Sequence, residues 1–240
     1  MIINEIKKLR FQHQVMALPC DLKVTAKLIN LLPNRTLLEF GTGSGGWPHV
    51  NTLIGAQFDK CYLIDNFSWA NEPTAKDVSE EHVNKWMQTP EDLQTYLQTN
   101  MKTNTVVAKL DTLNDDVSSV LKNMITDTIG ILRIDCILHF ETLLETIDQF
   151  MDPRTAVIFI DDIKLNGGFE RVRTLFRLIE GKGWHTLWFG EKECAIVKDS
   201  NLQVELFDKL ADLIFTDDEL LVIKERSPWG RFLSSRYLVG

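Results

Sequence analysis

A short glycine-rich segment is the first feature of the sequence that could do chemistry. Gly41-Thr-Gly-Ser-Gly-Gly46 follows an apolar run, and its glycines allow a tight turn and a close approach of the backbone to a ligand. Asp65 ends the next apolar run, 22 residues beyond Gly43, where a carboxylate can accept hydrogen bonds from two ribose hydroxyls. This spacing predicts a nucleoside site, and the alternative is a turn with a purely structural role.

Glu39 stands two residues before the first glycine and indicates which kind of nucleoside is bound. The pyrophosphate of a dinucleotide needs only backbone amides and the helix dipole. An acid at this place suits instead a ligand with a cationic amino-acid end, such as the ammonium and sulfonium of S-adenosylmethionine. The alternative is that Glu39 only bonds a neighbouring loop amide.

Three carboxylates end two later apolar runs, and these are Asp135, Asp161 and Asp162. Since parallel strands end at one edge of a sheet, we expect the three side chains to meet there. Crowded carboxylates repel one another, so one of them should hold a proton unless a cation is present. A divalent ion such as Mg²⁺ would neutralise them and orient a substrate oxygen. Otherwise Asp161 and Asp162 cap a loop and touch only cofactor or solvent.

Two residues near these acids are candidate general bases. An imidazole side chain can take up a proton near neutral pH, which makes His139 a candidate, and Lys164 follows Asp161 by three residues. The alternative for each is an ordinary solvent-exposed side chain. Together with Asp162 they make up the predicted catalytic set.

Apolar runs that alternate with amphipathic segments must position these side chains. We expect strands at 36–40, 60–65, 105–111, 129–135, 155–161, 184–189 and 194–198. Helices separate the first five strands, and the short spacing of the last two forces an antiparallel hairpin. The sequence therefore predicts an α/β fold with a Rossmann-like, doubly wound, seven-stranded sheet, mostly parallel with a C-terminal antiparallel hairpin.

The chain divides into three parts on this reading. A helical segment over 1–35 precedes a core over 36–198, and a helical extension occupies 199–240. Within the core, the polar insertion 66–103 either closes over a substrate as a lid or forms its own small core. The extension ends in a basic strip that either contacts phosphates or packs on the domain or on a sister subunit, which would make a homo-oligomer.

Two of these motifs resemble those of a known family. Leu37–Gly46 looks like the first motif of class I S-adenosylmethionine-dependent methyltransferases, and Tyr62–Asp65 resembles their second. The element order matches that fold across about residues 20–198. The resemblance implies S-adenosylmethionine as the cofactor, with Asp65 on the ribose, Asn66 or Phe67 beside the adenine, and Asp111 on the adenine amino group, where Asp115 and Asp116 compete. The residues expected to bind it are Glu39, Gly41, Thr42, Gly43, Ser44, Gly45, Asp65, Asn66, Phe67, Asp111 and Asp135.

The far carboxylates carry a narrower resemblance. Ile134–Phe140 and Val157–Asp162 are similar to metal-assisted small-molecule O-methyltransferases of the catechol and macrolide-sugar types. The resemblance implies a metal held by Asp135, Asp161 and Asp162. Two positions depart from the family pattern: Cys136 stands where glycine is frequent, and Leu138 stands where His or Lys is frequent, with His139 one place later.

Composition restricts the remaining choices. A formal net charge of −8 argues against a broad phosphate-binding surface. No apolar run reaches the ~18 residues that a membrane span needs, so we expect a cytoplasmic protein without membrane contact. The favoured function is O-methylation of a small-molecule acceptor. The alternatives are a nucleic-acid methyltransferase, an NAD-binding Rossmann dehydrogenase and a methyltransferase-like scaffold without catalysis.

Overall fold

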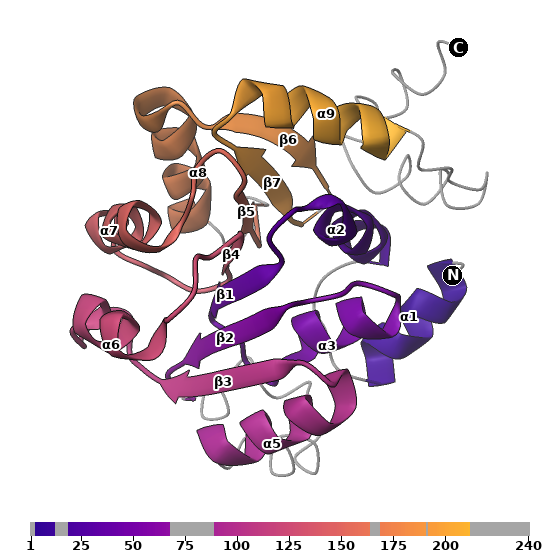
Figure 1. Ribbon diagram of the computed structural model, residues 1–240, viewed down its shortest axis with the longest axis vertical. Helices are drawn as coiled ribbons and strands as arrows, with labels where there is room; N and C mark the ends of the chain where they lie inside the picture. Colours follow the sequence, from indigo (N-terminus) through magenta and orange to yellow (C-terminus); the bar gives the residue numbers. More distant parts are fainter. Residues whose placement is uncertain (1–2, 13–18, 68–88, 164–168, 191, 212–240) are drawn as a thin grey trace.

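A seven-stranded sheet forms the centre of the computed structural model, which describes residues 3–12, 19–67, 89–163, 169–190 and 192–211 (Figure 1). The strand order is β3-β2-β1-β4-β5-β7-β6. The strands are β1 (Thr36–Phe40), β2 (Lys60–Asp65), β3 (Asn104–Lys109), β4 (Ile131–Ile134), β5 (Val157–Ile160), β6 (His185–Phe189) and β7 (Cys194–Val197). The first five strands pair in parallel, and β7 runs antiparallel to both β5 and β6. The predicted fold class is confirmed.

Helices cover both faces of the sheet (Figure 1). One apolar core lies between the sheet and α1 (Ile3–Gln12), α2 (Pro19–Leu31), α3 (Gly46–Leu53), α5 (Pro90–Met101) and α9 (Ser200–Ala211). The other core lies under α6 (Val117–Met124), α7 (Phe140–Phe150) and α8 (Phe169–Lys182). Successive strand residues alternate between the two cores, so Leu37 belongs to the first and Leu38 to the second. Burial on both faces explains why the strands read as near-continuous apolar runs.

The third strand ends earlier than the sequence pattern indicates. The third strand stops at Lys109, because Asp111 accepts hydrogen bonds from the Leu113 amide (3.0 Å) and the Asn114 side chain (2.8 Å). Such side-chain bonds to residues just ahead favour a turn over an extended strand. The helix after the glycine loop stops at Leu53, and Gly55 follows with φ of 108°.

The start of α2 meets the hairpin between β6 and β7. The carboxylate of Asp21 accepts a hydrogen bond from the backbone amide of Lys192 (2.9 Å). Gly190 passes so close that an added Cβ would lie 2.4 Å from an Asp21 oxygen. Because Cys194 pairs with Ile160 at the end of β5, this contact lies at the edge where the parallel strands end.

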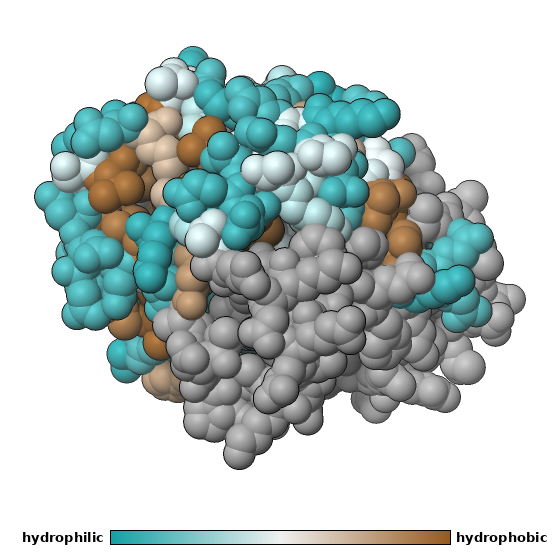
Figure 2. Space-filling model, turned by 90° about the horizontal axis from the view of Figure 1, so that it is seen from below, coloured by the Kyte–Doolittle hydropathy of each residue, from teal (hydrophilic) through white to brown (hydrophobic). Residues whose placement is uncertain are grey.

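Figure 2 shows one face of the molecule. Hydrophilic residues make up most of its described part, and hydrophobic residues appear as separate patches. No helix in the described ranges is long and apolar enough to cross a membrane. Residues 68–88, 164–168 and 212–240 lie outside the description, so the lid over 66–103 and the oligomer through the C-terminal extension stay predictions.

Candidate active site

The glycine loop leaves β1 and crosses toward β2. The amides of Gly41 and Thr42 donate to the carbonyl oxygen of Ile64 at 2.8 and 3.2 Å. Gly41 has φ of 83°, and a Cβ there would lie 2.7 Å from the backbone carbonyl of Asp135. Gly43 has φ of 55°, but no described atom lies within 4 Å of the place its Cβ would take. The loop is thus packed tightly at Gly41 and is open beside Gly43.

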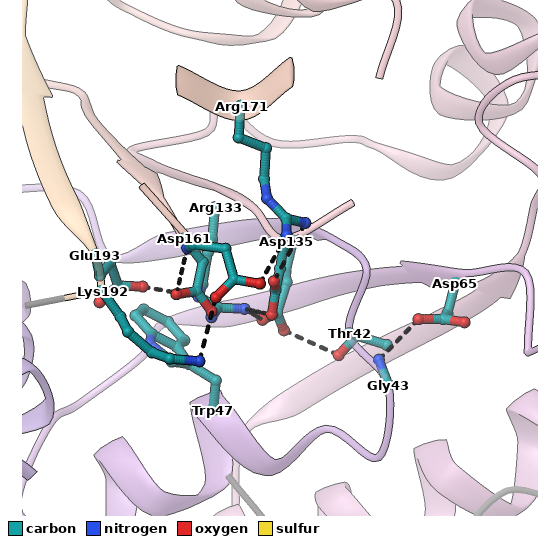
Figure 3. A network of polar contacts seen from close by, with 12 residues as sticks. Thr42, Gly43, Trp47, Asp65, Arg133, Asp135, Asp161, Arg171, Lys192 and Glu193 are labelled. Carbon is teal, nitrogen blue, oxygen red and sulfur yellow. Dashed lines mark hydrogen bonds and ion pairs between the residues drawn. The ribbon is translucent and has the colours of Figure 1, made fainter. Parts of the chain in front are cut away.

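Asp65 joins this loop to the end of β2. One carboxylate oxygen accepts the Gly43 amide at 2.7 Å (Figure 3), and the other accepts the Phe67 amide at 2.7 Å. The side chain is largely buried, with 8% of the residue exposed. Asp65 therefore holds the turn of the loop against the end of β2.

A buried arginine lies at the centre of the carboxylate group. Arg133, in the middle of β4, is 2% exposed and contacts acids from four directions (Figure 3). Its contacts are Nη1 to Glu39 (2.6 Å), Nη1 to Asp135 (3.0 Å), Nη2 to Asp161 (2.6 Å) and Nε to Glu193 (2.9 Å). The guanidinium also lies over the ring of Trp47, 4.8 Å from its centroid. One cation therefore connects β1, β4, β5 and the start of β7.

The acids around Arg133 differ in how open they are. Glu39 is fully buried, and its second oxygen accepts the Thr42 hydroxyl at 2.9 Å. Glu39 thus lies beneath the glycine loop and contacts the loop through Thr42. The Asp135 side chain is 27% exposed, whereas those of Glu193 and Asp161 are 0% and 3% exposed. Asp135 is the most open acid bound to Arg133.

Burial dominates the electrostatics of this group. Loss of water raises the pKa of Glu39 and raises that of Asp135 well above its usual value, although Arg133 opposes both shifts. The same cause raises the pKa of Glu193 to about 8. One Glu193 oxygen, Oε2, has no hydrogen-bond partner among the described residues. At neutral pH the Glu193 carboxyl therefore holds a proton for most of the time.

Two further cations hold the loop after β5. Asp162 receives Nη2 of Arg171 from α8 at 2.7 Å and Nζ of Lys192 at 3.2 Å. Arg171 also lies 3.7 Å from Asp135. Asp162 has φ of 52°, a left-handed conformation that costs a non-glycine residue roughly 1–2 kcal/mol. The two ion pairs hold Asp162 in this conformation.

Solved structures of several methyltransferases have the same architecture. An O-methyltransferase from Bacillus cereus in complex with SAH matches with a TM-score of 0.53 and 16% identity, over 82% of this chain and 90% of that one. The O-methyltransferase TomG from Streptomyces achromogenes, in complex with SAM, matches with a TM-score of 0.52 and 12% identity, over 82% and 89%. A TDP-rhamnose 3′-O-methyltransferase of calicheamicin biosynthesis matches with a TM-score of 0.50 and 11% identity, over 72% and 75%.

The chain has the class I methyltransferase fold. The resemblance seen in Leu37–Gly46 and Tyr62–Asp65 is confirmed for the fold. Structural similarity at such low sequence identities establishes the fold alone. No protein-family model matches the sequence, and no curated protein matches it.

In this methyltransferase fold, most of the residues predicted to bind the cofactor lie along one edge of the sheet. The glycine loop follows β1, Asp65 ends β2 and Asp135 follows β4. Gly45 precedes α3, where its φ is 67°, Asn66 is exposed and Phe67 is half-buried. Asp111 occupies the turn after β3, so its carboxylate is already used by Leu113 and Asn114. Their roles toward a cofactor stay predictions.

The predicted metal ligands do not fit a metal site. Asp135 and Asp161 are both bound by Arg133, and Asp162 is bound by Arg171 and Lys192. Within the described ranges, no group of three or more His, Cys, Asp or Glu side chains is arranged to hold a metal ion. The sequence correctly predicted that the three acids lie at the edge where the parallel strands end. It assigned their charge balance to a metal ion, whereas the structure places arginine and lysine side chains against them.

His139 takes no part in the contacts described above. His139 is exposed and directly precedes α7, without a side-chain hydrogen bond that caps the helix. Lys164 lies outside the described residues. Asp162 is occupied by its two cations. The catalytic assignments therefore stay predictions.

Four residues of the site were missed by sequence reasoning, namely Arg133, Arg171, Lys192 and Glu193. Arg133 left a usable signal, because a charge in the middle of the apolar run 129–135 must be paired if that run is a buried strand. The other three lie on an amphipathic helix or in a polar loop. Nothing in the pattern there separates them from solvent-exposed charges.

Proposed function

We propose that this chain is an S-adenosylmethionine-dependent methyltransferase that methylates an oxygen of a small-molecule acceptor. The observation that carries the proposal is the glycine loop, which is open at Gly43, is bonded to Asp65 and packs at Gly41 against the backbone of the partly exposed Asp135. This arrangement lies at the carboxyl ends of the parallel strands of a methyltransferase fold, where ligands of open α/β sheets bind.

The residues present fit that cofactor. Asp65 places a carboxylate beside the glycine loop, where ribose hydroxyls can donate to it, and the space beside Gly43 admits a ligand close to the backbone. Asp135 offers a carboxylate to the cationic amino-acid end, while Glu39 supports the loop from below through Thr42. When bound, the cofactor supplies a methyl group activated by its sulfonium charge.

The chain's own contribution is positioning and charge. Methyl transfer from sulfur to an acceptor oxygen is an in-line displacement, so alignment supplies much of the acceleration. The acceptor oxygen must lose its proton, and we keep His139 as the proposed base because it is exposed beside the strand-end loops.

Replacing His139 with alanine should lower the rate of methyl transfer about 100-fold or more if this is correct. The metal predicted from the sequence is not part of the proposal, because its ligands are bound by cations.

Two observations support a small acceptor rather than a nucleic acid. The structural neighbours named above are described as O-methyltransferases, one in tomaymycin synthesis and one acting on TDP-rhamnose. The net charge of −8 gives no broad attraction for phosphates.

Calorimetry tests the cofactor directly. The purified chain should bind S-adenosylmethionine and its demethylated product SAH. Asp65→Ala should weaken the binding of both ligands by about tenfold or more, because a charge-assisted hydrogen bond is lost. Transfer of a labelled methyl group to a panel of hydroxylated small molecules, with a structured RNA as comparison, then tests the acceptor class. Binding of NADH without binding of S-adenosylmethionine would overturn the proposal.

A further inference from the structure

Arg133 occupies the position that a metal ion would need. Its guanidinium contacts Asp135 and Asp161, two of the three acids that the metal-assisted pattern would use. The third, Asp162, has one oxygen bound to Arg171 and the other to Lys192. A divalent ion among these acids would have to displace three cations or lie beside them, and like charges repel strongly when they are buried.

The sheet register explains why one arginine reaches so many acids. Glu39 and Arg133 are direct partners in the β1–β4 ladder, and Arg133 is the partner of Phe159 on β5. Asp161 lies two residues beyond Phe159, and Glu193 lies two residues before Ala195, so period-two alternation puts both on the same face as Arg133. The planar fork of arginine, which stays charged at any ordinary pH, suits several carboxylates at once.

We infer that Arg133 replaces a divalent cation in this protein and positions the acids that receive the amino-acid end of the cofactor. Its Nη1 bridges Glu39, which lies beneath the loop, and Asp135, which is the most open acid bound to it. One nitrogen thus sets the position of both carboxylates. Arg133 is a positioning residue, since it is buried and acts through Asp135. The inference rests on the proposed function.

Metal binding gives the first test. Mn²⁺ is added to the chain alone and to the chain with SAH, and free Mn²⁺ is followed by electron paramagnetic resonance. We expect no saturable binding in either state. One Mn²⁺ bound per chain and lost in Asp161→Asn would overturn the inference. Since this test includes the chain without ligand, it decides the metal question even if SAH does not bind and the proposed function fails.

A pair of ligands tests the positioning role. SAH carries the amino-acid end, whereas 5′-methylthioadenosine has the same adenosine and thioether without it. Arg133→Lys should weaken the binding of SAH by about tenfold or more and the binding of 5′-methylthioadenosine by less than about twofold. EDTA is present throughout. Arg154→Lys is the matched control, because the Arg154 side chain is 81% exposed and pairs only with Asp152 among the ion pairs found. That variant should change neither affinity.

Two outcomes would contradict the positioning role. An equal loss for both ligands would show that Arg133 only supports the fold, and unchanged affinities would show that it does not act on the cofactor at all. If Arg133→Lys does not fold, Asp135→Asn replaces it, because this partly exposed acid is the group through which Arg133 acts. The same selective loss of SAH affinity is expected, and its absence would overturn the assignment.

Discussion

The acids of the site outnumber its cations. Glu39, Asp135, Asp161, Asp162 and Glu193 surround Arg133, Arg171 and Lys192, which makes five acids for three cations. Buried charges that are not balanced are costly, so the excess is relieved by protons that the acids keep. Burial raises the pKa of Glu39 and of Asp135, and it raises that of Glu193 to about 8, so Glu193 is the acid assigned a proton at neutral pH.

These protons make stability depend on pH. Glu193 has a pKa of about 8 in the folded chain against an ordinary value of 4.5, so folding takes up a proton between these values. The resulting stability is fully present below about pH 4.5 and is lost as the pH rises toward about 8. Glu193→Gln mimics the protonated acid and should flatten the decline of unfolding free energy by up to about 1.4 kcal/mol per pH unit.

Urea titrations at several values between about pH 6 and pH 8 measure that slope. The exposed Glu205, which pairs with Lys209 on α9, provides the control: Glu205→Gln should leave the slope unchanged. An identical decline in wild type and Glu193→Gln would show that Glu193 is ionised in the folded chain.

The glycine loop allows a matched comparison of two glycines. Gly41 and Gly43 both have positive φ, but only at Gly41 would a Cβ meet backbone, 2.7 Å from the Asp135 carbonyl. Gly43→Ala should cost about 1 kcal/mol of unfolding free energy through its conformation alone, whereas Gly41→Ala should cost about 2–3 kcal/mol. Chemical denaturation measures both. Equal losses would mean that the loop moves away from β4 without cost.

The sequence predicted the loop and Asp65 but not the partners of the acids. The former depend on neighbours along the chain: a strand, a turn and the next strand end. The latter depend on contacts between distant segments, since Arg133 and Glu193 lie 60 positions apart, and Glu39 and Arg133 lie 94 apart. A register between strands sets those pairs, and it follows from packing rather than from local pattern.

At the scale of elements, α2 and the β6–β7 hairpin form one unit at the site edge. Asp21, in the first turn of α2, is 1% exposed and accepts the Lys192 amide. The next residue along the hairpin, Glu193, binds Arg133. Helix α2 therefore helps to position an acid of the site, although Asp21 and Lys192 lie 171 positions apart in the sequence.

Removing the Asp21 carboxylate should loosen the hairpin. Asp21→Ala leaves a buried amide without its partner, which should cost about 1–3 kcal/mol of unfolding free energy. Amide hydrogen exchange at Lys192 should accelerate in the variant, while exchange at Val107 on β3, whose amide is bonded to Gln94, should change only with global stability. Unchanged exchange at Lys192 would show that the hairpin is held by other contacts.

Element ends were predicted less well than element types. Strands β1 and β2 begin and end where the apolar runs predict, but the run 105–111 extends past the end of β3. The difference arises from Asp111, whose side chain bonds two residues ahead. The end of such a strand depends on a local competition between turn and strand conformations, and the pattern of apolar residues does not indicate its outcome.

At the scale of the whole molecule, the sequence was most informative. Near-continuous apolar strands, amphipathic helices between them and a closely spaced final pair leave few topologies open. The confirmed fold class follows from those features, whereas the strand order β3-β2-β1-β4-β5-β7-β6 was not predicted and comes from the structure. The function is less determined, because the same sheet edge serves different nucleoside ligands and only the side chains there discriminate.

The rise in thermal stability that a ligand causes can show which nucleoside ligand the intact chain prefers. A ligand that binds only the folded protein stabilises it by about 2.7 kcal/mol at a free concentration of one hundred times Kd. For a domain of this size, that corresponds to a rise in Tm of roughly 5–10 °C. SAH should produce this rise, and NADH should produce none, because Glu39 beneath the loop and Asp135 beside it favour a cationic amino-acid end over a pyrophosphate. Asp65→Ala should reduce the shift, and a larger shift with NADH than with SAH would favour a dehydrogenase.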